Sequence, residues 1–294
     1  MSDFFTPDLL KAILRMATPL LFAALGGLIS ERAGVINIAL EGMMLTGAFF
    51  AVAGTQWTGS PWLGLVIGML AASALALVHA IWCITFRGNQ IVAGTAVNLI
   101  GGGLTAFLIQ RIWSRAGTSD SVEKLPSIAG GISILLPLAF LLVPVVWFIL
   151  FRTKQGLHIQ AAGEHPQAAE SVGINVTRYR YAAVIASGVL AGLGGAFMSI
   201  GDLGRFTMDM SQGRGFIALA AVIFGGWTPF GAMIATLLFG SSQAIQIQAQ
   251  ATPNFPISSD LLLALPYLLT LVAITGIVRT RSGPAGLGTH ATAH

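Results

Sequence analysis

The chain has 294 residues, of which 55% are hydrophobic and only 9% are Asp, Glu, Lys or Arg. Globular domains carry about 25% charged residues. So little charge cannot cover a water-exposed surface, which excludes a soluble globular protein and a disordered chain. The net charge of +4 forms no basic run, which excludes a nucleic-acid-binding patch. The single cysteine, Cys83, excludes a disulfide framework or a thiolate metal cluster within the chain.

Stretches without charged residues reveal the membrane-spanning segments, because a helix that crosses a bilayer needs about 20 apolar residues. The stretches long enough for one span are residues 88–110, 125–151, 181–201 and 261–278. Residues 42–86 and 215–259 are each long enough for two, divided by turns rich in Gly, Thr and Pro. With residues 9–30 added, the sequence predicts an all-α polytopic membrane protein of roughly 8–10 transmembrane helices.

The basic residues predict the orientation, since Lys and Arg gather in cytoplasmic loops. Segment 152–180 is the longest polar insertion, and it carries Arg152, Lys154, Arg178 and Arg180. If this segment faces the cytoplasm, the N-terminus lies outside. We therefore expect a transmembrane domain over residues 1–280 with one cytoplasmic loop at 152–180. Residues 281–294 are rich in Gly, Thr and Ala, and we expect a mobile C-terminal tail there.

Glycines recur one helical turn apart inside the predicted spans. The two pairs are Gly64 with Gly68 and Gly188 with Gly192. Small residues at this spacing let helix backbones approach closely in a membrane. We expect close helix packing at these positions.

The first polar stretch lies between two apolar runs and contains Asn37 and Glu41. Because a carboxylate in the membrane is costly, Glu41 should face a cavity or a partner group. One interpretation is a broken helix whose polar end lines a substrate pathway, together with Asn98 in a later span. The alternative is a structural hinge, in which Glu41 accepts hydrogen bonds from free amides at a helix start.

The second polar stretch lies within residues 155–175. Pro166 is suited to the first turn of a short helix, Glu164 precedes it, and Gly173 fits the helix end. The small residues Ala168 and Ala169 would form a knob that another protein could grip. A short cytoplasmic helix of this kind is a coupling element if a motor protein binds there. The alternative is a solvated loop with one helical turn.

The third stretch predicts a half-helix. Residues 215–226 (GFIALAAVIFGG) are short for a complete span, and their N-terminus could face the pathway.

Motifs for soluble catalysis are missing from the sequence. There is no Gly-Lys pair, hence no phosphate-binding P-loop, and no His-Glu-x-x-His motif or other metal-ligating cluster. We therefore expect no catalytic residues and no metal site.

These three stretches together resemble one family. Residues 31–44 (ERAGVINIALEGMM), 162–174 (AGEHPQAAESVGI) and 215–226 resemble motifs of ABC importer permeases, in the branched-chain amino acid, ribose and galactose permease family. The resemblance runs from about Thr18 to Arg279. The Glu-Arg-Ala-Gly form of the first motif resembles the nucleoside-type branch rather than the ribose branch.

The resemblance implies a multi-pass permease of the bacterial inner (plasma) membrane that moves nucleosides or a related sugar-like solute by alternating access. It implies that an ABC ATPase subunit, which carries the ATP and Mg²⁺, grips a coupling loop. The residues that we assign to this loop are Gly163, Glu164, Pro166, Ala168, Ala169 and Gly173. A second, similar permease subunit and an external substrate-binding protein or lipoprotein are the other implied partners.

Other functions remain open at this stage. A permease of the same family could carry simple sugars or branched-chain amino acids. An ion-coupled secondary transporter would need its own ion site, and few acidic residues besides Glu41 lie in the predicted spans.

Overall fold

The computed structural model describes residues 7–115, 117–128, 131–251 and 283–289. Helices make up most of these residues, as the sequence predicts. The helices are α1 (Pro7–Arg32), α2 (Leu40–Thr58), α3 (Pro61–Ala80), α4 (Gln90–Trp113), α5 (Leu135–Arg152), α6 (Lys154–Glu164), α7 (Pro166–Ser171), α8 (Val176–Ala196), α9 (Arg214–Phe224) and α10 (Pro229–Ala251). Two π-helical segments continue α3 and α8, namely η2 (Ile81–Thr85) and η3 (Phe197–Leu203). The short strands β1 (Ser127–Ile128) and β2 (Ile132–Ser133) pair antiparallel, with Ile128 opposite Ile132.

Six of the described helical segments are long and apolar enough to cross a membrane. They are Pro7–Arg32, Pro61–Thr85, Gln90–Trp113, Leu135–Arg152, Val176–Leu203 and Pro229–Gln250. α2 has 19 residues, most of which are buried among the other helices. α9 has only 11 residues, which confirms the predicted half-helix. The predicted span at 261–278 lies outside the described residues.

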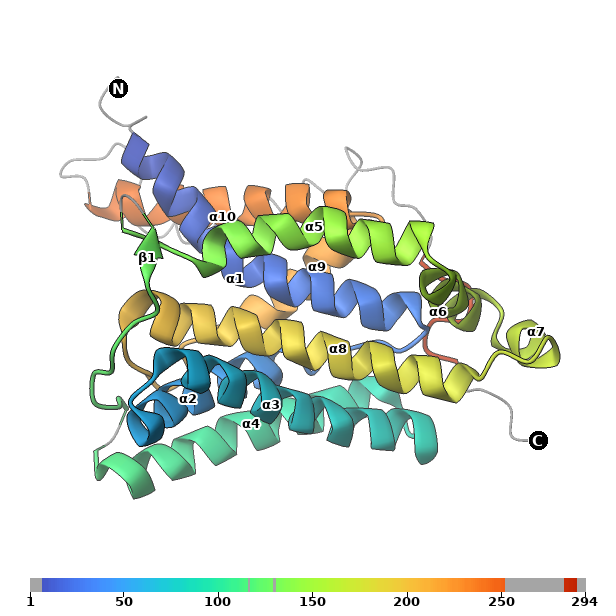
Figure 1. Cartoon of the computed structure of the whole chain (residues 1–294), viewed down its shortest axis with the longest axis horizontal. Coiled ribbons are helices and arrows are strands. Elements are labelled where there is room, and N and C mark those ends of the chain that lie inside the picture. The colour runs from blue at the N-terminus through green and yellow to red at the C-terminus, as the bar shows by residue number, and fades with distance from the viewer. Residues whose placement is uncertain (1–6, 116, 129–130, 252–282, 290–294) are drawn as a thin grey trace.

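The long helices run roughly along one axis of the molecule (Figure 1). α1 and α8 are the most buried of the candidate spans, whereas α4 and α5 expose most of their surfaces. α6 and α7 lie at one end, and α1 begins at the opposite end (Figure 1). This placement agrees with an external N-terminus if α6 and α7 face the cytoplasm.

The turn between α2 and α3 shows why residues 42–86 form two helices. Gly59 adopts the left-handed conformation with φ of 67°, which a glycine reaches without steric cost. Pro61 then begins α3, where its missing N–H leaves no hydrogen bond unmade. The sequence Gly59-Ser60-Pro61 therefore ends one helix and starts the next.

The predicted glycines do lie at close helix contacts. A Cβ added to Gly68 would lie 2.6 Å from the carbonyl oxygen of Gly47, and one added to Gly188 would lie 2.5 Å from Cβ of Ala76. These contacts join α2, α3 and α8. Larger side chains at these positions would force the helices apart.

The C-terminal segment differs from the expected mobile tail. Residues 283–289 lie against the end of the bundle that carries α6 and α7. The Gly286 amide donates to the Gly163 carbonyl at 2.8 Å, and the Gly288 amide donates to the Gly34 carbonyl at 3.0 Å. This part of the tail is thus docked by backbone hydrogen bonds, which its glycines permit by allowing close approach.

Candidate functional site

A non-helical break of residues 33–39 separates α1 from α2. Several polar side chains satisfy its backbone groups. Gln90 accepts from the Ile36 amide at 2.7 Å, the His79 ring lies 3.1 Å from the Ile36 carbonyl, and Ser30 donates to the Val35 carbonyl at 2.8 Å. Irregular backbone inside a membrane protein needs such partners, because lipid supplies none. Polar side chains from α1, α3 and α4 therefore stabilise the break.

Asn37 and Asn98 both hold the backbone of this break and of the α2 start. The buried Asn37 accepts from the Ala39 amide at 3.1 Å and donates to Ser187 of α8 at 2.8 Å. Asn98 accepts from the Gly42 amide at 2.8 Å and donates to the Ile38 carbonyl at 2.9 Å. These hydrogen bonds all go to groups of the protein. Both side chains therefore stabilise the local backbone.

Glu41 lies in the first turn of α2, but its carboxylate caps a different helix. One oxygen accepts from the Gly213 amide at 2.8 Å, and the other accepts from the Gly215 amide at 2.6 Å. These are free amides at the start of α9, where the helix dipole favours a negative charge. Acceptance from free amides at a helix start is the contact that the hinge interpretation of Glu41 predicts.

The Glu-Arg-Ala-Gly motif meets the turn that follows α9. Glu31 accepts from the Trp227 indole N–H at 2.5 Å, and the Arg32 guanidinium donates to the Trp227 carbonyl at 2.6 and 2.8 Å. Trp227 has a φ of 51°, an unusual conformation for a non-glycine residue. Both ends of the half-helix α9 are thus fixed by carboxylates from the region of the break.

The short helix that the sequence predicts at Pro166 is present as α7. Pro166 is its first residue, and Gly173 follows its end with a φ of 86°, as the sequence predicts. Ala168 is exposed, but Ala169 is buried against Ala162 and Val176, so only one of the two alanines can form the expected knob.

Exposed residues next to Ala168 form a surface around the end of α7. We call Gln167, Ala168, Ser171 and Val172 the α7 face, and Val172 is 74% exposed. Gly163 and Glu164, in contrast, make contacts within the chain. Gly163 packs against the Arg32 carbonyl at the end of α1, and Glu164 accepts from the Ala285 amide at 3.0 Å.

Arg180 joins three segments at this end of the molecule, namely the break, α6 and the docked tail. It is buried, and its guanidinium donates to the carbonyls of Ala33 at 3.1 Å, Ala162 at 3.4 Å and Thr289 at 2.7 Å. These carbonyls belong to the break, to α6 and to the docked tail. From the sequence, Arg180 is only one of the basic residues of a predicted loop, and nothing in its sequence neighbourhood signals this role.

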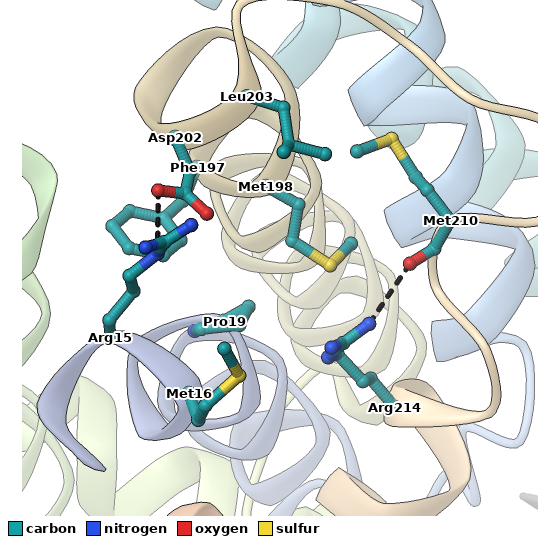
Figure 2. Close-up of a pocket in the computed structure, with 9 residues that line it drawn as sticks. All are labelled: Arg15, Met16, Pro19, Phe197, Met198, Asp202, Leu203, Met210 and Arg214. Carbon is teal, nitrogen blue, oxygen red and sulfur yellow. Dashed lines mark hydrogen bonds and ion pairs between the residues drawn. The ribbon is translucent and has the colours of Figure 1, made fainter. Parts of the chain in front are cut away.

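Two adjoining cavities open toward the other end of the molecule. The first, of about 190 Å³, lies between α1, η3 and the start of α9. Figure 2 shows the Arg15 guanidinium paired with Asp202 on one side of this cavity and Arg214 on the other. The second, of about 250 Å³, shares Arg15, Phe197 and Asp202 with the first.

The linings of these two cavities contain none of the three predicted pathway residues, Asn37, Glu41 and Asn98. Nor does the described part of the chain contain a group of three or more His, Cys, Asp or Glu side chains that could hold a metal ion. The site consists of contacts between helices beside the two cavities.

Comparison with known proteins identifies the family. The family model described as "Branched-chain amino acid transport system / permease component" matches residues 9–274. The chain belongs to this family. It is an ABC importer permease subunit that spans the membrane several times, and a permease subunit does not itself hydrolyse ATP.

Relatives of this permease carry several substrate names. The guanosine ABC transporter permease protein NupQ of Bacillus subtilis is 40% identical over 95% of each chain. The nucleoside ABC transporter permease protein NupC of Lactococcus lactis is 36% identical over 88% of each chain. The putative glucose ABC transporter permease protein TsgC13 of Haloferax volcanii is 37% identical over 95% of this chain and 94% of that one.

A solved structure of PsaBC from Streptococcus pneumoniae in complex with Fab shares the fold. It aligns over 93% of each chain with a TM-score of 0.52 and 14% sequence identity. The permease thus combines a known arrangement of helices with a sequence that lies nearest, among these relatives, to the guanosine protein.

Proposed function

We propose that this permease moves nucleosides into the cell by alternating access, in a complex with an ABC ATPase. The observation that carries the substrate class is the 40% identity, over 95% of both chains, to a permease named for guanosine. The pairing of charges beside the cavity supports a neutral solute. Arg15 pairs with Asp202 at 2.7 Å, and Glu41 neutralises the positive end of α9.

We further propose that the α7 face receives the ATPase. It is exposed, lies at one end of the bundle and carries the apolar Val172 beside the small Ala168. In this arrangement ATP and Mg²⁺ are held by the ATPase. The coupling residues of this chain fall into two groups: Ala168 touches the motor, while Gly163 and Glu164 tie the α6–α7 corner to the rest of the permease.

The remaining partners follow from the same proposal. A second permease subunit completes the translocation pathway, and an external binding protein or lipoprotein delivers the solute at the end where α1 begins. Asn37, Glu41 and Asn98 then contribute to the pathway indirectly, by fixing the break and the start of α9 rather than by touching the solute.

The test is uptake of labelled guanosine and uridine by cells with and without this chain. Unlabelled nucleosides, glucose, ribose and leucine serve as competitors. We expect uptake to be lost with the chain and to be reduced only by nucleosides. Loss of glucose entry with unchanged nucleoside uptake would instead assign the sugar alternative, for which the 37% identity to a glucose-named permease is the supporting observation.

A further inference from the structure

The cavity in Figure 2 is lined by residues of α1, of η3 and of the start of α9. α9 has 11 residues and so spans about 16 Å, roughly half of a hydrocarbon core of about 30 Å. The turn that follows α9 meets the end of α1 at Trp227, near α6. The start of α9, with Arg214, therefore lies near mid-depth, and the cavity reaches down to it.

The lining combines two kinds of chemistry. Asp202 and the guanidinium groups of Arg15 and Arg214 supply acceptors and donors. Phe197 and three methionines (Met16, Met198 and Met210) supply flat and adaptable apolar surface. A planar heterocycle with polar edges fits both parts, because guanidinium groups pair with the ring nitrogen and carbonyl oxygen of a purine, and a carboxylate accepts from N–H groups.

The charges around the cavity select against anionic solutes. Arg15 is paired with Asp202, and Arg214 lies within electrostatic reach of both Glu41 and Asp202. The two guanidinium groups are thus balanced by Asp202 in the lining and by Glu41 outside it. A phosphate group would find no uncompensated positive charge among these four residues, whereas a neutral base can exchange hydrogen bonds with the existing pairs.

The local backbone also differs from an ordinary helix. Phe197 and Asp202 both belong to η3, a π-helical segment that continues α8. π-helical turns are rare and occur often at functional sites, because they redirect side chains at a cost in backbone regularity. Here the π-helical segment brings the aromatic ring and the carboxylate to the same cavity (Figure 2).

We propose that this cavity is a subsite for the heterocyclic base of a neutral nucleoside, preferentially a purine, with Asp202 and Arg214 at its polar edges and Phe197 and the methionines against its faces. The proposal rests on the nucleoside function proposed above. It assigns Asp202 as a residue that contacts the solute rather than as half of a structural ion pair alone.

The test compares Asp202→Asn with Asp120→Asn in the complete transporter reconstituted in lipid vesicles. Asp120 pairs with Arg115 at 3.1 Å on the exposed surface, so its substitution removes an ion pair away from the cavity. Guanosine uptake is measured at saturating solute and binding protein, beside ATPase activity without solute. We expect Asp202→Asn to lower uptake at least 10-fold with ATPase activity within 2-fold, and Asp120→Asn to change neither.

Two outcomes overturn the proposal in distinguishable ways. Unchanged guanosine uptake by Asp202→Asn refutes the subsite and leaves the proposed function intact, whereas a wild-type transporter that carries no nucleoside refutes both. If Asp202→Asn fails to assemble, Met16→Phe decides the matter, because it fills the cavity without touching the ion pair. It should lower uptake with ATPase activity retained, and unchanged uptake would refute the subsite.

A separate observation concerns the docked tail at the opposite end. Residues 283–289 touch the α6–α7 corner through Gly163 and Glu164, and the break through Gly34. Gly283 also packs against the Trp227 ring, and Thr289 accepts from Arg180. One short segment therefore connects the α6–α7 corner to both the break and the turn after α9.

We infer that residues 283–289 act as a positioning strap, which transmits movement of α7 to the break between α1 and α2. This inference rests on the proposed docking of the ATPase at α7. A Cβ added to Gly286 would lie 2.7 Å from the Gly163 carbonyl oxygen, so a larger residue there separates the strap from the corner. Gly103 of α4, with nothing within 4 Å of an added Cβ, gives a matched control.

The measurement is the amount of solute transported per ATP hydrolysed, in the reconstituted transporter. A merely structural role would lower transport and hydrolysis together and leave this ratio unchanged. We expect Gly286→Val to lower the ratio at least 5-fold and Gly103→Val to leave it within 2-fold. An unchanged ratio for Gly286→Val, and for a chain that ends after residue 282, would refute the strap. If the wild-type permease does not bind the ATPase, the docking proposal is refuted instead.

Discussion

Glu41 offers the sharpest test of the half-helix arrangement, through the substitution Glu41→Gln. The carboxylate accepts from two amides, those of Gly213 and Gly215, at 2.8 and 2.6 Å. Glutamine keeps one acceptor oxygen but turns an NH₂ group toward the other amide, and it removes the negative charge from the positive end of α9. A hydrogen bond to a charged group contributes about 1.5–3 kcal/mol, so we expect α9 to lose about 2 kcal/mol of local stability.

Hydrogen exchange measured by mass spectrometry on the complete transporter reads this loss directly. A loss of about 2 kcal/mol corresponds to about 30-fold faster exchange of the amides in the first turns of α9. The control is Glu123→Gln, which removes a carboxylate from an exposed position. If amide exchange in α9 of Glu41→Gln stays within 2-fold of wild type, the carboxylate does not stabilise this helix.

Three other predictions concern other parts of the molecule. Trp227→Phe leaves the buried carboxylate of Glu31 without its indole donor, so it should lower the free energy of unfolding of the transporter, measured by chemical denaturation, by about 2 kcal/mol. A loss below about 0.5 kcal/mol would contradict the contact. Arg180→Lys cannot reach three carbonyls at once, so it should raise protease cleavage of the docked tail, whereas unaltered cleavage would argue against the tie. Ala168→Arg should lower the amount of ATPase that co-purifies with the permease and leave insertion of the permease into the membrane unchanged. Arg178→Ala, on the same side of the membrane, is the control. Full recovery of the ATPase with Ala168→Arg would show that the α7 face is not part of the interface.

The sequence predicts the helices well because their limits are local. Charge-free stretches measure the spans, and Gly59 with Pro61 marks the turn between α2 and α3. The short helix α7 is likewise readable from Pro166 at its start and Gly173 after its end. In each case a few neighbouring residues determine the backbone conformation.

The partners of the polar residues could not be predicted, because they lie far away in the sequence. Glu41 meets amides 172 and 174 positions later, and Glu31 meets Trp227 196 positions later. The sequence shows that each carboxylate needs a partner but not which one. That is why the interpretation of Glu41 had to remain open between a pathway and a hinge.

The tail and Ala169 show a second limit. A composition rich in glycine and threonine is typical of a mobile segment, yet the same glycines let residues 283–289 approach Gly163 and Gly34 closely enough for backbone hydrogen bonds. Ala169 follows Ala168 directly, but a helix turns by about 100° per residue, so the two point in different directions. One lies exposed and the other packs against Val176.

The most direct measurement of the proposed function is guanosine accumulation in lipid vesicles that contain this permease with its ATPase and second permease subunit. The external binding protein is added outside, and ATP is trapped within. We expect accumulation that requires ATP and persists when ionophores abolish every ion gradient. Accumulation that proceeds without ATP and collapses with an ionophore would contradict it and would assign an ion-coupled transporter instead.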